Sequence, residues 1–222
     1  MPSSTGAGAA REHVAEAARR LAAHGLVLGT AGNISERLAP DRVAISPTGG
    51  PLEELTADQV TVIDLDGEWV EGELEPTSEL TLHLGIYHRY DAGAVVHTHS
   101  PMATALSCAM EEVPVVHYHM LALGGSVRVA PYATFGTAEL AEATLDALQD
   151  RSAALMANHG AIVYAADAAA AVESALLLEW ACGVYWHASA LGPPRALDAE
   201  QQQDVVSAVL ERGYGQVRPG SR

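Results

Sequence analysis

Lysine is absent from this sequence of 222 residues, and all twelve of its cationic side chains are arginines. Without a lysine amine, the chain can form neither a Schiff base with a carbonyl substrate nor a lysine-anchored pyridoxal phosphate. A P-loop, which uses a lysine to bind nucleotide phosphates, is excluded in the same way. If the protein handles a carbonyl carbanion, a group other than an imine must stabilise the charge.

Positive charge is also scarce relative to negative charge. Twelve arginines face 28 acidic residues, which gives a formal net charge of −16. Nucleic acid and anionic membranes both require clustered cations, so neither is expected as a partner. The 49% of hydrophobic residues can build a core, and the length favours one domain. We expect that domain over residues 9–222, after a small, polar and disordered segment at residues 1–8.

Cysteine is limited to Cys108 and Cys182, which are far apart and form no CxxC motif. Two reduced thiols in a cytoplasmic protein are the simplest interpretation. The first residues show no apolar stretch of a secretory signal. The most apolar long segment, residues 161–191, contains three acidic residues, so it predicts a buried or interface helix instead of a membrane span.

Helical and strand patterns alternate along the chain, with one hairpin among them. This mixture predicts a single-domain α/β fold whose central mixed, largely antiparallel sheet is covered by helices. Helices are predicted at residues 9–24, 77–90, from 101 onward, 137–149, 167–191 and 198–212; strands are predicted at 42–45, 60–64, 68–71, 94–99 and 113–121, with two more flanking 158–160.

Two pairs of histidines have metal-ligand spacing. His97 and His99 lie in a predicted strand, where residues i and i+2 point to the same face and can converge on one ion. Two separately hydrogen-bonded histidines would produce the same pattern. His117 and His119 repeat the spacing on another predicted strand, and spacing alone does not distinguish the pairs.

A third histidine lies in a turn. His159 is followed by Gly160, which allows the backbone to approach a site closely. Three histidines plus an open position are typical of a catalytic zinc, and Glu79, at the start of a predicted helix, is one of many candidate bases. His83 and His88, five residues apart on that helix, are interpreted as structural.

Three turns rich in small residues, at 29–33, 46–50 and 77–78, can bind an anion through N–H groups and hydroxyls without lysine. A cupin barrel, which also uses a His-x-His pair, would require a glutamate soon after the pair. The first carboxylate after His99 is Glu111, so a cupin is disfavoured.

Six motifs occur in a fixed order from about Glu12 to Tyr214: GTAGNIS (29–35), SPTG (46–49), PTSE (76–79), AVVHTHSP (94–101), APYATFGT (130–137) and NHG (158–160). Together they resemble the class II aldolase family of the fuculose-phosphate aldolase type. This family also includes ribulose-phosphate epimerases and adducin heads.

The resemblance implies specific roles. His97, His99 and His159 become the ligands of one Zn²⁺ per subunit, and Glu79 becomes the catalytic carboxylate. Tyr118 matches an active-site tyrosine, Phe135 lies in a substrate-side motif, and Tyr214 matches a C-terminal tyrosine that reaches a neighbouring subunit's site in a homotetramer. The positions that match phosphate-binding residues are Thr30, Asn33, Thr48, Gly49, Thr77 and Ser78. His119 stands where an apolar residue is expected.

The implied reaction is zinc-dependent aldol cleavage of a ketose 1-phosphate, with L-fuculose 1-phosphate as the leading substrate and dihydroxyacetone phosphate and L-lactaldehyde as products. Zinc would stabilise the enediolate, Glu79 would transfer the proton, and a tyrosine would protonate the aldehyde oxygen. A sugar-phosphate 4-epimerase, dehydratase or decarboxylase on the same scaffold is the alternative. A non-catalytic adducin-like binding module is a further alternative, which the retained histidines and Glu79 disfavour.

Overall fold

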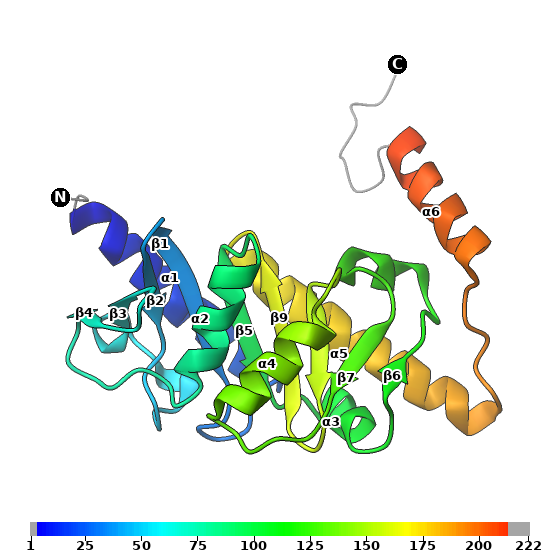
Figure 1. The fold of residues 1–222 in the computed structure, drawn as a ribbon, viewed down its shortest axis with the longest axis horizontal. Coiled ribbons are helices and arrows are strands. Elements are labelled where there is room, and N and C mark those ends of the chain that lie inside the picture. Colours follow the sequence, from blue (N-terminus) through cyan, green and yellow to red (C-terminus); the bar gives the residue numbers. More distant parts are fainter. Residues whose placement is uncertain (1–3, 213–222) are drawn as a thin grey trace.

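The computed structural model describes residues 4–212 of the chain. In this part of the chain, nine strands form one sheet in the order β4-β3-β2-β1-β5-β9-β8-β7-β6 (Figure 1). All neighbouring strands are antiparallel except β7 and β8, which are parallel. The predicted mixed, largely antiparallel sheet is therefore confirmed.

The strands are β1 (Asn33–Ala39), β2 (Arg42–Ile45), β3 (Thr61–Asp64), β4 (Trp69–Glu71), β5 (Ala94–Thr98), β6 (Glu112–Val113), β7 (Val127–Ala130), β8 (Ala153–Met156) and β9 (Gly160–Ala165). The α-helices are α1 (Ser4–Ala23), α2 (Leu80–Arg89), α3 (Pro101–Ser107), α4 (Ala138–Ala147), α5 (Ala168–Leu191) and α6 (Ala199–Arg212). Three short 3-10 helices complete the set: η1 (Leu52–Glu54), η2 (Ala57–Gln59) and η3 (Tyr118–Leu123).

Helices cover both faces of the sheet. Helices α1, α3 and α5 share one apolar core with it, whereas α2 and α4 share a second core on the opposite face (Figure 1). Strand β5 lies between the two cores, with Ala94 and Val96 in the first core and Val95 in the second. Successive strand residues point to opposite faces, so β5 requires apolar side chains on both sides. A polar residue in this strand is therefore exceptional, which draws attention to His97.

Helix α5 is long and apolar enough to cross a membrane by length and composition. In the fold it packs against β5, β9, α1 and α3. Its buried side consists of small and apolar residues such as Ala171, Ala175 and Leu178, and the side chain of Asp167 caps its start by accepting from the N–H of Ala170. The structure thus places residues 168–191 as a helix of the core, in agreement with the sequence prediction.

The predicted strand over 113–121 is wrong. Strand β6 ends at Val113, and the 3-10 helix η3 begins at Tyr118. His117 is the N-cap residue of η3, and its ring accepts a hydrogen bond from the N–H of His119. Pro114, which has no N–H to donate to a ladder, follows directly after Val113.

Other boundaries also differ from the prediction. Helix α1 begins at Ser4, not at residue 9, and β1 was not predicted. Strand β1 carries Glu36 and Arg37 in a central position of the sheet, so its pattern lacks the apolar alternation on which strand prediction depends.

Candidate metal centre and active site

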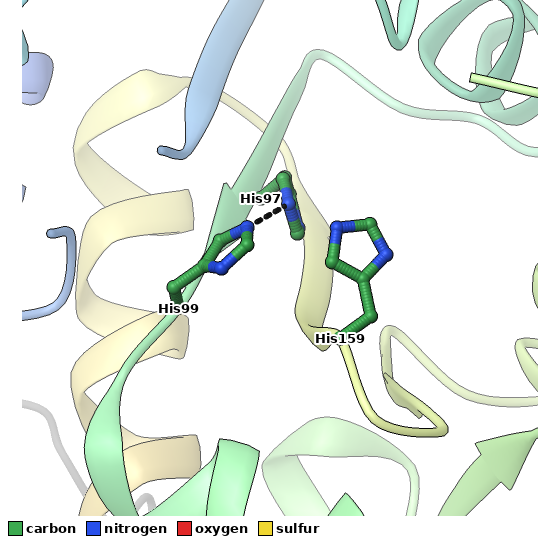
Figure 2. Close-up of side chains that lie close together, drawn as sticks. All are labelled: His97, His99 and His159. Carbon is green, nitrogen blue, oxygen red and sulfur yellow. Dashed lines mark hydrogen bonds between the residues drawn. The ribbon is translucent and has the colours of Figure 1, made fainter. Parts of the chain in front are cut away.

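Strand β5 delivers the first two histidines. His97 is fully buried within the strand, and His99 follows the last strand residue, with its N–H donating to the carbonyl of Leu26. The Nδ1 of His97 donates to the carbonyl oxygen of Ala161 at 2.9 Å. In the neutral ring this leaves Nε2 without a hydrogen, and that atom lies 2.9 Å from Nε2 of His99 (Figure 2).

The turn between β8 and β9 delivers the third histidine. Asn158 has a left-handed φ of 56°, which turns the chain so that His159 faces the β5 pair. Gly160 follows, and a Cβ at this position would lie 2.3 Å from the carbonyl oxygen of Thr98. The ring centroid of His159 consequently lies 4.8 Å from that of His97, and the three rings converge (Figure 2).

A carboxylate lies beside the three imidazoles. Glu79 occupies the N-cap position of α2 and is 6% exposed. Its Oε2 is 3.1 Å from Nε2 of His97 and accepts a hydrogen bond from Nδ2 of Asn33 at 2.9 Å. Its Oε1 is 3.6 Å from Nε2 of His159 and, although buried, has no hydrogen-bond partner. The two carboxylate oxygens therefore have different environments.

Burial and neighbouring charges together shift the pKa values of His99, His159 and Glu79. Desolvation, reinforced by the neighbouring rings, lowers the pKa of His99 to about 4 and also lowers the pKa of His159. Burial alone would raise the pKa of Glu79, but the charge interaction with His97 and the Asn33 hydrogen bond outweigh it and hold the pKa below 4.5. Neutral imidazoles and an ionised carboxylate are the forms that bind metal ions.

The donor set fits a divalent metal ion. The ligating atoms of His97, His99 and His159 all lie within 4.8 Å of one another. In neutral His97, the bare Nε2 and the Glu79 oxygen would place two electron-pair donors 3.1 Å apart, an arrangement that a bound cation or a proton on the ring stabilises. Three histidines with a carboxylate nearby are a donor set that zinc accepts while keeping a position open.

A pocket of about 410 Å³ opens over Glu79, His99 and His159. All six residues predicted to bind phosphate line it: Thr30, Asn33, Thr48, Gly49, Thr77 and Ser78. No arginine is among its lining residues in the described chain. Neutral N–H groups, hydroxyls and the Asn33 amide thus line the pocket together with two of the histidines and Glu79, and we call the six residues predicted to bind phosphate the anion nest.

Comparison with known proteins agrees with this geometry. The profile of the family described as class II aldolase and adducin N-terminal domain matches residues 12–186. The chain belongs to this family.

Named relatives of this class II aldolase are carbon–carbon lyases. The present chain is 38% identical over 208 residues to a 5-deoxy-D-ribulose 1-phosphate aldolase of Bacillus thuringiensis, and the match covers 93% of this chain and 97% of the relative. It is 40% identical over 190 residues to the L-fuculose phosphate aldolase of Escherichia coli K12, covering 85% and 86%. The solved structure of an L-fuculose 1-phosphate aldolase superposes with a TM-score of 0.87 at 33% identity, covering 95% and 98%.

Of the other residues predicted for the class II aldolase site, some line the pocket and others lie outside it. Phe135 lines the pocket and is 66% exposed, on the loop before α4. Tyr118 is in η3 and does not line the pocket; it lines an apolar groove between η3 and α6 instead. His117 and His119 are also at η3, away from the three-histidine cluster, and Tyr214 lies outside the described residues.

The sequence patterns did not indicate one contact beside the candidate site. His83, interpreted only as structural, is fully buried four residues after Glu79 and contacts Asn33. The i, i+4 spacing of Glu79 and His83 on one helix places both on one face, and this spacing is the signal that could have indicated the connection.

Proposed function

We propose that this class II aldolase reversibly cleaves a ketose 1-phosphate to dihydroxyacetone phosphate and an aldehyde, using one zinc ion held by His97, His99 and His159. One observation carries the proposal. The partner-free Oε1 of Glu79 lies beside the three-histidine cluster, at a pocket that the anion nest also lines. A metal site, a base and a phosphate site around one pocket suit a phosphorylated ketose.

Each part of the pocket has a role in the proposed reaction. The anion nest binds the phosphate and so brings C2 and C3 of the substrate toward the histidines and Glu79. Bound zinc supplies electrophilic stabilisation of the negative charge that develops on the carbonyl oxygen. In cleavage, the C3–C4 bond breaks, its electron pair enters the enediolate of dihydroxyacetone phosphate, and Glu79, after taking a proton from solvent, delivers it to C3. In synthesis, Glu79 removes the same proton.

The C4 hydroxyl must lose its proton as C4 becomes the aldehyde, which requires a second acid–base group. We assign this role to a tyrosine, Tyr118 or Tyr214, from a neighbouring subunit. Tyr118 does not line the pocket of its own chain, and α6 presents apolar residues such as Leu210, which is 78% exposed. These features support a homotetramer with sites at subunit interfaces. The reduced thiols and the sugar-phosphate substrate support a cytoplasmic location.

L-fuculose 1-phosphate is the leading substrate, with L-lactaldehyde as the second product. The relative from Bacillus thuringiensis supports 5-deoxy-D-ribulose 1-phosphate as a second candidate, because its similarity extends over 93% of the chain. Both sugars share the first three carbons that the proposed site would bind. They differ in the aldehyde portion, so a direct comparison of kcat/KM ranks them.

The test is the release of dihydroxyacetone phosphate from each sugar phosphate, followed with a coupled reductase. Chelator treatment should abolish release, and added zinc should restore it, because the three imidazoles then regain their ion. A zinc-loaded protein that releases no dihydroxyacetone phosphate from either sugar would contradict the proposal. Product analysis of the same samples would then distinguish epimerised from dehydrated sugar phosphates, and a decarboxylase would be tested separately with a phosphorylated 3-oxo acid, the substrate class of a 33% identical relative.

A further inference from the structure

A chain of buried hydrogen bonds leads away from Glu79 into the core. Asn33 Nδ2 donates to Glu79 Oε2 at 2.9 Å, and Asn33 Oδ1 lies 2.5 Å from His83 Nε2. The other ring nitrogen of His83 lies 2.7 Å from Ser35 Oγ, which lies 2.8 Å from the Tyr87 hydroxyl. All five residues are buried, with exposures between 0% and 6%.

The repeats of side-chain directions along a helix and along a strand together produce this series of hydrogen bonds. Glu79, His83 and Tyr87 are four residues apart at the start of α2 and along it, so they share one helix face. Asn33 and Ser35 are two residues apart on β1, so they share one strand face. The two faces meet, and polar groups from each alternate along the contact. The arrangement occupies a place where apolar residues would otherwise pack.

Hydrogen-bond chemistry fixes the direction of the chain. A carboxylate accepts only, so Asn33 must present its amide N–H₂ to Glu79 and its carbonyl oxygen to His83. His83 must then donate through Nε2. Burial lowers the pKa of His83 to about 3, so the ring is neutral and its Nδ1 accepts from Ser35. Ser35 in turn accepts from Tyr87, and every donor points toward the carboxylate.

We propose that His83, supported by Ser35 and Tyr87, is a positioning residue that orients the Asn33 amide and thereby anchors Oε2 of Glu79, leaving Oε1 as the oxygen that transfers the substrate proton. This inference rests on the proposed aldolase function. It also gives Asn33 a task beyond the anion nest, because one amide N–H and the amide oxygen are engaged within the protein.

Loss of the His83 ring has a defined consequence. The Asn33 oxygen would be buried without a donor, and the amide, no longer held at that oxygen, would leave its bonded position beside the carboxylate. Glu79 would then lose its anchor, and the proton-transferring oxygen would no longer be fixed at C3 of the substrate. The five other residues of the anion nest would still bind the phosphate, so kcat should fall by a larger factor than KM rises.

The decisive comparison is His83→Leu against His83→Gln in the zinc-loaded protein. His83→Leu should lower kcat about 10–100-fold, as is usual for residues that orient a metal-site group, with unchanged zinc content. The glutamine side chain can still donate to Asn33, so His83→Gln should recover most of the loss. His88→Leu on the exposed part of α2 is the matched control and should retain wild-type kcat, because the His88 ring bonds the Leu65 carbonyl at the surface and not the buried chain.

A second readout does not depend on activity. Ring ¹⁵N chemical shifts of the metal-free protein should show His83 as the neutral Nε2–H tautomer, and Ser35→Ala, which removes the bond to Nδ1, should lower kcat. An Nδ1–H tautomer in the wild type, or equal kcat losses in His83→Leu and His83→Gln, would overturn the positioning role. If His83→Leu does not fold, Ser35→Ala decides: an unchanged kcat overturns the proposal. A wild type without turnover overturns the aldolase function and the positioning role together, whereas turnover with equal losses overturns only the latter.

Discussion

At the scale of single residues, the ligating tautomer of His97 depends on strand pairing. The β5–β9 register sets Thr98 opposite Ala161, and the Ala161 carbonyl oxygen accepts from His97 Nδ1. A backbone carbonyl can only accept, so Nε2 of neutral His97 is available to a metal ion at any time. The sheet thus prepares the ligand before the ion binds.

Replacement of Glu79 by glutamine tests the carboxylate. The Glu79→Gln side chain would have nearly the same volume and would leave the three imidazoles intact, so zinc content should be retained. Turnover should fall about 10²–10⁴-fold, the usual contribution of a general acid–base group. Single-turnover kinetics with metal analysis measure both quantities.

The matched control is Glu73→Gln, which changes an exposed carboxylate shortly before α2 and should leave both quantities unchanged. Full turnover in Glu79→Gln would remove Glu79 from proton transfer. Loss of zinc in that variant would instead make Glu79 a required ligand.

At the scale of secondary-structure elements, the turn between β8 and β9 must approach β5 closely. A Cβ at Gly160 would lie 2.3 Å from the Thr98 carbonyl oxygen and 3.3 Å from Cε1 of His97. Gly160→Ala should therefore lower the free energy of unfolding by about 1–3 kcal/mol, the usual cost of overpacking. It should also weaken zinc binding, because His159 would move with the turn. Denaturant unfolding and zinc titration measure the two effects.

Gly183→Ala is the control for this prediction. A Cβ at this position in α5 would make ordinary contact with Met102 at 3.6 Å. Alanine is a better helix former than glycine, so the variant should be as stable as the wild type or more stable by about 1 kcal/mol. Equal stability of Gly160→Ala and the wild type would show that the turn adapts without cost.

Elements with strong periodicity or caps were predicted well. The capped helices after Thr137 and Asp167 and the β3–β4 hairpin match the predictions closely, because their signals are local. The candidate site was predicted through its resemblance in motifs, and the six residues predicted to bind phosphate do line one pocket. Strand β1 was not predicted because its pattern lacks apolar alternation. The residues that support Glu79 were not predicted because the partners in those contacts lie 46–52 residues apart in sequence.

At the scale of the whole molecule, the scarce positive charge of this protein of net charge −16 lies outside the candidate pocket, which no arginine of the described residues lines. Several arginines donate to backbone carbonyls at the ends of elements. Arg37 bonds those of Ala92, Pro40 and Tyr87, and Arg128 bonds that of Gln149. Their charge therefore stabilises the fold, while the pocket presents neutral donors beside a candidate metal site. Phosphate affinity should consequently depend on the metal ion more than on any arginine.

Helix α6 bears on how the subunits of the proposed tetramer assemble. This helix extends from the body of the molecule (Figure 1). It contacts η3, and the groove between them is lined by Tyr118, Leu177 and the apolar side of α6. Leu210→Glu should leave the single chain folded, since this side chain is 78% exposed, but it should dissociate the proposed tetramer. Because the proposed sites take a tyrosine from a neighbour, kcat should fall with dissociation.

Ser207→Glu adds the same charge to an exposed position of α6 that does not line the groove, so it should preserve both assembly and activity. Sedimentation velocity, paired with activity at the same protein concentration, measures the outcome. A fully active monomer of Leu210→Glu would contradict the shared site, because each chain would then hold every group needed for proton transfer. An unchanged tetramer would instead place the interface elsewhere and leave the origin of the second acid–base group to be found on that other surface.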